Sequence, residues 1–326
     1  MNIKSEIINF LYCFDKNYNS QAFTSIISLL DNVQTCININ IIHKNEVVIT
    51  DVPENIRNHS KLNDLNIYKF KDSEHNFPNL KDAHVSEATY YRLFIQNYLL
   101  RVRGIIIYLD ADTVIVNDPT KLFLKYSKQL KDSGYIFGAR TEVKKSSIEN
   151  YEDLIVNNDV FPFERLGINN LYFNAGVLFI NYDLWIKKNI GDKLLKKMYS
   201  LGDNIIYWDQ DVINSYTNGR YIQLEKGMNY YNSDVKEKTL QSDIVLIHYL
   251  GSKKPWKSSG IFTHASKYYH QNYRKIYRDD FHITHQWKIY SIKQLLINIF
   301  NLNIIKIDKP ISFIKHFIKS ILSNRK

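Results

Sequence analysis

The sequence lacks the features that identify secreted and membrane-spanning proteins. It has only two cysteines, Cys13 and Cys36, among 326 residues, which excludes a disulfide framework and favours a reducing compartment. No apolar run approaches the ~20 residues that a membrane-spanning helix needs. The N-terminal segment MNIKSEIINF lacks the charged, apolar and small-residue order of a signal peptide. We therefore expect a cytoplasmic protein.

Acidic residues are scarce in the last quarter of the chain. From Gly251 onward there are 15 Lys and Arg but only 3 Asp and Glu, whereas the first 250 residues hold 28 and 30. The net charge of +10 is therefore a property of the C-terminal region. The composition changes after Trp256, so we divide the chain into a core domain, residues 1–256, and a basic C-terminal region, residues 257–326.

Apolar runs alternate with helical patterns over the first 250 residues. Continuous or alternating apolar runs predict strands, and apolar spacings of three and four predict helices. The expected strands are 7–15, 36–43, 66–70, 105–109, 135–140, 173–182 and 243–251, and the expected helices begin near residues 21, 86 and 209. Ser86 fits the N-cap of the second helix, whose apolar face would run from Tyr91 to Leu99. This order predicts an α/β fold in which helices cover both faces of a sheet and ligands gather at the carboxyl ends of strands.

Two Asp-x-Asp motifs occur in this framework, Asp110-Ala-Asp112 and Asp209-Gln-Asp211. The first ends the apolar run IIIYL, and alternate side chains at a strand end point to one side. Two carboxylates there can hold Mg²⁺ or Mn²⁺ together with diphosphate oxygens, although a solvated strand-to-turn corner is the alternative. The second motif opens a helix, where Asp is also favoured by capping and by the helix dipole.

The segment HYLGSKKPW, which follows the last expected strand, supports the metal interpretation. A lone His such as His248 is more often structural than a ligand. Here, however, Gly251 permits close backbone approach and Lys254 offers a partner to phosphate. An imidazole ligand beside Asp110 and Asp112 would favour Mn²⁺ over Mg²⁺.

Six segments in consistent order, from about Ile7 to Trp256, resemble the family-8 retaining glycosyltransferases, in particular the bacterial lipopolysaccharide galactosyl- and glucosyltransferases. They are CFDKNY, SEATYYRLFI, YLDAD, YFNAGVLFIN, WDQDVIN and HYLGSKKPW. The resemblance implies that residues 1–256 form a single GT-A fold. It also implies that the donor is UDP-galactose or UDP-glucose and that the hexose is transferred with retention of its anomeric configuration.

The same resemblance implies roles for individual residues. Asp110, Asp112 and His248 would bind Mn²⁺, with Mg²⁺ as the alternative ion. The residues that would contact the donor are Cys13, Asp15, Asn17, Tyr18, Arg92, Asp110, Ala111, Asp112, Asn174, Ala175, Gly176, Asp209, Gln210, His248, Gly251 and Lys254. Tyr18 would stack on the base, and Cys13 departs from the small residues that are common at its position in the family. From the residues alone, Tyr18 could equally be a packing residue, Arg92 a solvated helical residue and Asn174–Gly176 a tight turn.

The expected mechanism follows from the charges that develop in the reaction. Breaking the sugar–UDP bond builds negative charge on the β-phosphate and oxocarbenium character on the sugar, so Mn²⁺ and Lys254 would stabilise the leaving diphosphate. Retaining glycosidases use a carboxylate nucleophile, but the resemblance places Gln210, a poor nucleophile, beside Asp209 at the hexose. We therefore expect front-face attack, in which the leaving UDP accepts the proton of the acceptor hydroxyl. Asp211 as a nucleophile is the alternative.

The C-terminal region predicts a membrane partner. Ile311, Ile314, Phe317, Ile318, Ile321 and Leu322 form one helical stripe, and Lys309, Lys315, Lys319, Arg325 and Lys326 occupy much of the remaining surface. A basic amphipathic helix suits an anionic membrane surface, which would place the enzyme on the inner face of the cytoplasmic membrane beside a lipid-linked glycan acceptor. The alternative is a helix that docks on the core with a solvated basic face. No recognition motif for nucleic acid accompanies the charge.

Two other classes of protein remain as alternatives. A haloacid-dehalogenase-like phosphatase would use Asp110 as nucleophile and Asp112 as acid/base, but the Gly expected after the second Asp is missing and the motif lies deep in the chain. A non-catalytic membrane-surface binding protein would not need Asp110, Asp112, Gln210 and His248 together.

Overall fold

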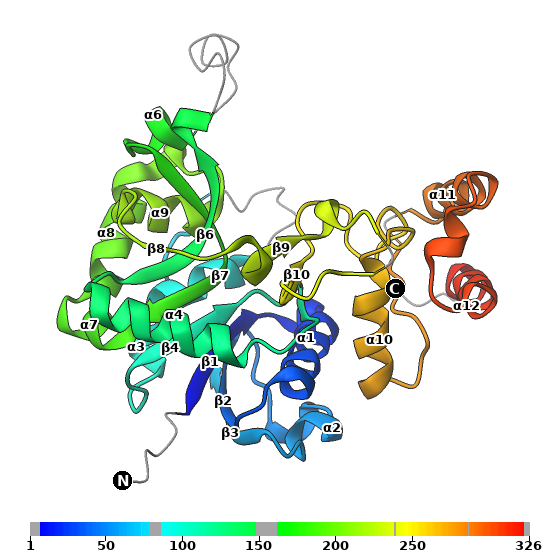
Figure 1. Ribbon diagram of the computed structural model, residues 1–326, viewed down its shortest axis with the longest axis horizontal. Helices are drawn as coiled ribbons and strands as arrows, with labels where there is room; N and C mark the ends of the chain where they lie inside the picture. The colour runs from blue at the N-terminus through cyan, green and yellow to red at the C-terminus, as the bar shows by residue number, and fades with distance from the viewer. Residues whose placement is uncertain are drawn as a thin grey trace.

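The computed structural model describes residues 7–72, 74–78, 86–147, 162–237, 239–285 and 287–322. Its centre is a seven-stranded mixed sheet with the strand order β3-β2-β1-β4-β7-β6-β8 (Figure 1). The strands are β1 (Ile8–Phe14), β2 (Ile37–His43), β3 (Leu62–Lys69), β4 (Ile105–Leu109), β6 (Phe137–Lys144), β7 (Leu171–Asn181) and β8 (Ile222–Gln223). The predicted α/β fold is confirmed, and of these strands only the two-residue β8 had no counterpart in the sequence prediction.

Helices cover both faces of this sheet, as the strand patterns require. In β1, Phe10 and Tyr12 pack with α1 (Asn19–Asn32) and α4 (Thr120–Ser133), whereas Leu11 and Cys13 pack on the opposite face. Successive side chains of a strand point to opposite faces, so a strand that is buried on both sides is apolar throughout. The opposite face is covered by η3 (Glu87–Phe94), α3 (Ile95–Tyr98), α7 (Tyr182–Lys187), α8 (Ile190–Leu201) and α9 (Trp208–Thr217). The shorter elements are η1 (Lys16–Tyr18), η2 (Ile49–Asp51), α2 (Glu54–Arg57), η4 (Lys145–Ser147), α6 (Pro162–Leu166), η5 (Gly202–Asn204), η6 (Lys226–Asn229) and η7 (Asn232–Asp234).

The length of β7 brings its first half to the edge of the sheet where β4 ends. β3, β2, β1 and β4 are parallel, whereas β7 is antiparallel to β4. β7 has 11 residues and β4 has five, so β7 continues past the carboxyl end of β4. The N–H of Asp110 donates to Gly176 O at 2.8 Å. The segment Asn174–Gly176 is therefore extended strand and not the tight turn that the sequence also allowed.

The helix that begins after Ser86 differs from the prediction. Ser86 caps it as expected, since its Oγ accepts from the Ala88 N–H at 3.1 Å. The conformation is 3-10 up to Phe94, however, and the single apolar face is wrong, because every residue from Tyr90 to Phe94 is buried. Side chains three residues apart eclipse in a 3-10 helix, so Thr89 and Arg92 project in the same direction.

A second, three-stranded sheet delivers His248 to the end of β4. Its order is β5 (Thr113–Ile115), β10 (Leu246–His248) and β9 (Tyr230–Tyr231). β10 is antiparallel to β5, with His248 opposite Thr113. The Asp110-Ala-Asp112 turn, which connects β4 to β5, therefore lies directly beside His248. The strand expected at 243–251 is confirmed but shorter, and it belongs to this second sheet.

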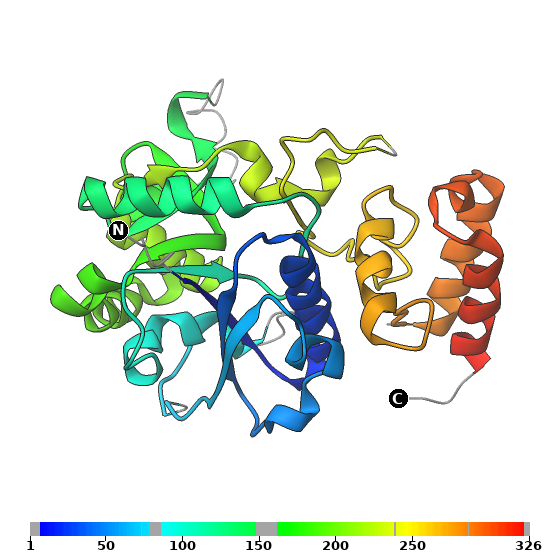
Figure 2. The same cartoon turned by 60° about the horizontal axis from the view of Figure 1, so that its bottom comes forward.

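The C-terminal region is helical, as predicted, and extends from one side of the molecule (Figures 1 and 2). α10 (Ser266–Ile276) packs against α1, while α11 (Lys288–Phe300), η8 (Asn303–Lys306) and α12 (Pro310–Leu322) lie beyond it. The last three enclose a small apolar cluster that includes Phe281, Leu295, Phe313 and Phe317. Among the described residues, none of the helices is both long enough and apolar enough to cross a bilayer.

The predicted apolar stripe of α12 is divided between two environments. Phe317 is buried in the small cluster, and Ile314 and Ile321 pack partly against it. The other three members, Ile311, Ile318 and Leu322, are exposed. The sequence offered two alternatives for this stripe, docking on the protein or exposure to a partner. Half of the stripe packs on the protein, and the other half is exposed. Arg325 and Lys326 lie outside the described residues.

Candidate active site

A cavity of about 710 Å³ lies at the carboxyl ends of β1 and β4. Its walls come from both of these ends, from η3, β6 and β7, from the start of α9 and from the loop after β10. Fourteen of the sixteen residues that were predicted to contact a donor line this cavity, and Asn17 and Ala175 do not. The volume lies within the range of about 300–1,000 Å³ that is usual for small-molecule sites.

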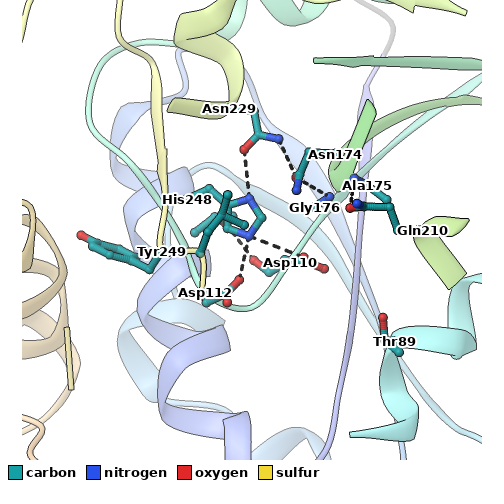
Figure 3. Close-up of polar contacts among 12 residues, drawn as sticks. Thr89, Asp110, Asp112, Asn174, Ala175, Gly176, Gln210, Asn229, His248 and Tyr249 are labelled. Atoms are coloured by element: carbon teal, nitrogen blue, oxygen red, sulfur yellow. Dashed lines mark hydrogen bonds and ion pairs between the residues drawn. The ribbon is translucent and has the colours of Figure 1, made fainter. Parts of the chain in front are cut away.

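Asp110, Asp112 and His248 converge at one wall of the cavity (Figure 3). One ligand atom from each lies within 4.8 Å of those of the other two. His248 Nε2 is 3.2 Å from Asp112 Oδ1 and 3.6 Å from Asp110 Oδ2. Two carboxylates and one imidazole are a donor set that suits a divalent transition ion such as Mn²⁺. The residues present therefore fit the predicted metal.

The two carboxylates of this group have different electrostatic surroundings. Burial raises the pKa of Asp110, although Arg92 opposes that effect, with its Nη1 3.7 Å from Asp110 Oδ1. Burial would also raise the pKa of Asp112, but Lys254 and His248 outweigh it and hold that pKa below its ordinary value. Lys254 Nζ donates to Asp112 Oδ2 and also to Tyr249 O. Asp112 is therefore ionised at neutral pH.

A buried ion pair between Arg92 and Asp209 lines the cavity next to Asp110. Arg92 donates from Nε and from Nη2, at 3.0 Å for the latter, to the Asp209 carboxylate, and from Nη1 to Ala175 O at 2.5 Å. Thr89 Oγ1 donates to Asp209 Oδ1 at 2.6 Å. Asp209 is fully buried, so the 3-10 alignment of Thr89 and Arg92 supplies the partners that its charge requires.

Gln210 is fixed in orientation by three neighbours. Its Oε1 accepts from the Ala175 N–H at 2.9 Å, and its Nε2 donates to Tyr172 OH at 2.9 Å and to Glu142 Oε2 at 3.3 Å. Trp208, at the start of α9, has φ of 49°, a left-handed value that is strained for a bulky residue. This strained turn leads into the helix that carries Gln210 to the cavity.

Asp211 lies behind the cavity wall and is fully buried. Both Nη atoms of Arg165 donate to it, at 2.6 and 3.3 Å, and Tyr172 OH donates at 2.7 Å. The N–H groups of Ile206 and Tyr207 each donate at 2.8 Å. A carboxylate that accepts this many hydrogen bonds is a structural anchor for the start of α9, and this arrangement argues against the nucleophile alternative.

Residues at and after the end of β1 also line the cavity. Asp15 caps η1 by accepting from the Asn17 N–H at 2.8 Å, whereas Asn17 itself is exposed. Tyr18 lines the cavity and also meets Trp256 edge to face at 6.2 Å between ring centroids. Cys13 lines the cavity too, and burial raises the pKa of its thiol. Tyr18 therefore packs on the protein and is at the same time available to a ligand.

Four residues that sequence reasoning missed contact the predicted site residues. They are Thr89 against Asp209, Glu142 and Tyr172 against Gln210, and Asn229 against His248. Burial raises the pKa of Glu142, which lines the cavity. Thr89 could have been found from its spacing of three from Arg92 if the 3-10 conformation had been foreseen. Tyr172 opens the segment YFNAGVLFIN but was given no role of its own, whereas Glu142 and Asn229 come from segments without a motif.

Comparison with known proteins finds related sequences. The model of "Glycosyl transferase family 8" matches residues 9–260. A lipopolysaccharide 1,2-glucosyltransferase of Escherichia coli K12 is 30% identical over 276 residues, which cover 81% of this chain and 77% of that protein. A putative glycosyltransferase of Haemophilus influenzae is 27% identical over 268 residues, which cover 77% of this chain and 74% of that protein.

The fold has solved counterparts. The crystal structure of the galactosyltransferase LgtC, in complex with donor and acceptor sugar analogues, superposes with a TM-score of 0.66 at 19% identity. The match covers 82% of this chain and 96% of LgtC. The GT-A fold that the sequence motifs implied is thereby confirmed.

Proposed function

Because this chain belongs to glycosyl transferase family 8, we propose that it transfers galactose or glucose from a UDP-sugar to a glycan, with retention of the anomeric configuration. One observation carries the proposal. A single cavity joins three potential metal ligands to the Arg92–Asp209 pair and to Gln210. The motif resemblance assigned these groups to the metal, the donor and the transferred sugar. The phosphatase alternative is set aside by the family membership.

The metal that best suits the site is Mn²⁺, with Mg²⁺ as a weaker substitute. Asp110, Asp112 and His248 would hold it, and the imidazole favours the transition ion. When bound, the ion neutralises charge that develops on the leaving diphosphate. Lys254 lines the cavity next to Asp112, and we assign it to the diphosphate, where its ammonium adds to that neutralisation.

The surroundings of the carboxylates support front-face attack. Asp209 is neutralised by Arg92, and Asp211 is held behind the wall by Arg165. Gln210 is a neutral amide whose Oε1 already accepts from the Ala175 N–H. A double displacement needs a free carboxylate on the far face of the sugar, which none of these three offers. We therefore assign removal of the acceptor proton to the leaving UDP, and we assign Asp209 and Gln210 to holding the hexose.

Glu142 remains as a carboxylate that faces the cavity. It accepts from Gln210 Nε2, so we assign it to fixing the Gln210 amide. A nucleophilic role for Glu142 is the alternative that this position favours.

The acceptor in this proposal is a lipid-linked, lipopolysaccharide-type glycan. One relative carries the name lipopolysaccharide 1,2-glucosyltransferase. The C-terminal helices of this chain expose an unusual amount of apolar side chain, including Ile289 at 84%, Phe300 at 88% and Leu296 at 61%. We propose that this surface rests on an anionic membrane on the cytoplasmic side, beside the acceptor.

Basic residues lie on the same C-terminal segment as the exposed apolar side chains. Between Trp287 and Leu322 there are six lysines and one acidic residue, Asp308, and Asp308 is paired with Arg274. Each Lys or Arg near an anionic bilayer contributes about 1 kcal/mol to binding. Apolar insertion and positive charge on the same helices are the combination that interfacial helices use.

The proposed reaction is tested by incubating the protein with a panel of UDP-sugars and measuring UDP release with and without Mn²⁺. We expect slow, Mn²⁺-dependent hydrolysis of UDP-galactose or UDP-glucose and its loss in Asp112→Asn. The matched control is Asp64→Asn, on β3 at the far edge of the sheet, which should hydrolyse at the wild-type rate. Absence of release from every UDP-sugar, or normal release by Asp112→Asn, would overturn the proposal.

A further inference from the structure

Asn229 lies at the junction of the metal ligands and the sugar-facing strand. It ends η6, it is completely buried, and its side chain is placed between His248 and Asn174 (Figure 3). Neither the motifs nor the predicted donor contacts include it. A buried amide must satisfy both its oxygen and its NH₂ group, so the two neighbours determine which way round it sits.

The orientation of this amide follows from one backbone group. The Gly176 N–H donates to Asn174 Oδ1 at 3.0 Å, and a backbone N–H can only donate. The atom of Asn174 that faces it is therefore oxygen. The same oxygen is 2.9 Å from Asn229 Nδ2, which must be the donor. Asn229 Oδ1 is then the atom that faces His248 Nδ1, at 3.0 Å.

This orientation determines which ring nitrogen of His248 carries hydrogen. A carbonyl oxygen can only accept, so Nδ1 must be the protonated nitrogen. In the neutral ring Nε2 then keeps its lone pair, and Nε2 is the atom that faces Asp112 and Asp110. Partners of this kind orient histidine ligands in metal sites and fix their tautomer.

We propose that Asn229 is a positioning residue that fixes the Nδ1–H tautomer of His248, so that Nε2 is held ready as a ligand for a divalent ion. Its NH₂ group does a second task, because it holds Asn174, which lines the cavity on the sugar side. One amide thus connects the metal ligands to the strand that we assign to the sugar. This inference rests on the proposed function, since it needs a metal at Asp110, Asp112 and His248.

The two tasks of Asn229 can be separated by substitution. Asn229→Asp keeps an acceptor for the His248 Nδ1–H but cannot donate to Asn174. Asn229→Leu removes both contacts at similar volume. We expect Mn²⁺ affinity, measured by titration calorimetry on the full chain, to fall about 10–100-fold in Asn229→Leu, the usual cost of losing such a partner. In Asn229→Asp it should stay within a few-fold of wild type, while UDP-hexose affinity, measured with Mn²⁺ present, falls.

A spectroscopic measurement distinguishes positioning from general damage to the fold. The ¹⁵N shifts of His248, assigned by comparison with His248→Gln, should show protonated Nδ1 in the wild type and in Asn229→Asp, and a tautomer mixture in Asn229→Leu. Asn40→Leu is the matched control, since Asn40 is also fully buried and its Nδ2 donates to Phe10 O in β1. It should leave Mn²⁺ affinity and the His248 shifts unchanged.

The outcomes separate this inference from the function beneath it. A wild-type protein that binds no Mn²⁺ and releases no UDP overturns the proposed function. Wild-type protein that binds Mn²⁺, together with Asn229→Leu that binds it equally well, overturns the role of Asn229 alone. A wild-type His248 that is protonated on Nε2 and not on Nδ1 does so as well.

Discussion

Gly176 and His248 are packed so closely that a methyl group on Gly176 would lie 2.1 Å from Cε1 of the histidine ring. The same methyl group would lie 2.8 Å from Asp110 Oδ2. The glycine is therefore needed because two proposed metal ligands approach its backbone closely. Its backbone conformation is not the reason, since a residue with a side chain could adopt the same strand conformation.

Gly176→Ala should consequently displace His248 and Asp110 and reduce Mn²⁺ affinity by at least tenfold, the lower end of what a disturbed ligand shell costs. Titration calorimetry with Mn²⁺ checks this. Gly138→Ala on β6 is the control, because its methyl group would meet Phe179 Cβ at an ordinary 3.4 Å. Equal Mn²⁺ affinity in the two variants would contradict the proposed ligand geometry.

The buried Arg92–Asp209 pair predicts a stability effect that does not depend on substrate. Arg92→Met should lower the free energy of unfolding by about 3–5 kcal/mol, because it leaves a buried carboxylate without its counter-charge. The double variant Arg92→Met/Asp209→Asn should recover part of this loss, since no unpaired charge remains. Urea denaturation of the three proteins measures both effects. A single variant as stable as the wild type would show that Asp209 finds another partner.

The sequence predicted the Arg92–Asp209 neighbourhood only through resemblance. From spacing alone Arg92 could be a solvated helical residue and Asp209 a helix start. The strand ends at Asp15 and Asp110 were more accessible to prediction, because a continuous apolar run that stops at an Asp marks a buried strand and its end. Burial of a charge, in contrast, depends on what lies across the cavity, and no local pattern contains that information.

The C-terminal region shows the same limit for apolar patterns. The helical period of α12 was visible in the sequence. The apolar stripe alone, however, does not show whether each of its residues packs on the protein or faces outward. Phe313, which lay outside the predicted stripe, is completely buried, and Ile311, which lay within it, is exposed. Phe313 is buried because it packs in one cluster with Phe262 and Phe281. Such contacts between distant segments cannot be read from the local sequence of α12.

Glu142→Gln separates the two roles that its position allows. If Glu142 fixes Gln210, the variant keeps an oxygen acceptor for Gln210 Nε2, and the turnover number for hexose transfer should fall less than tenfold. If Glu142 were a nucleophile, turnover would fall by orders of magnitude. Steady-state rates of hexose transfer distinguish these results. Front-face attack also predicts that no covalent glycosyl-enzyme is seen by mass spectrometry of either protein.

Two buried histidines make the packing of α10 sensitive to acid. Burial lowers the pKa of His270 to about 3 and that of His282 to about 4, whereas an unfolded histidine has a pKa of about 6.5. The unfolded chain therefore binds more protons below about pH 6.5, and the free energy of unfolding should fall by up to about 1.4 kcal/mol per pH unit for each histidine until the folded pKa is reached.

Urea denaturation at a series of pH values between about 7 and 5 tests this dependence. In His270→Gln the amide can still donate to Pro255 O, the partner of His270 Nε2 at 3.0 Å, but it cannot titrate. The pH slope of its unfolding free energy should therefore be smaller than that of the wild type. Identical slopes would place the acid sensitivity elsewhere in the chain.

The proposed membrane surface predicts that exposed apolar residues of α11 contribute to vesicle binding. Leu296 and Phe300 are four residues apart on α11 and are exposed, so Leu296→Ser/Phe300→Ser removes apolar area without opening the protein core. Leu100→Ser/Ile186→Ser is the matched control, since both residues are exposed and lie outside the C-terminal helices. Co-sedimentation with vesicles that contain phosphatidylglycerol should decrease for the first variant and not for the second.

Charge and apolar contact should contribute to that binding separately. Raised salt screens the lysines but not the inserted side chains, so salt should weaken wild-type binding to anionic vesicles and leave a remainder that the Leu296→Ser/Phe300→Ser variant lacks. UDP release from a soluble UDP-hexose should be unchanged in this variant, because α11 lies beyond α10 (Figure 2) and none of its residues lines the cavity. If the variant still sediments with vesicles as the wild type does, the bilayer does not contact this surface. If it instead changes only the oligomeric state seen in gel filtration, the occupant is a second copy of the chain.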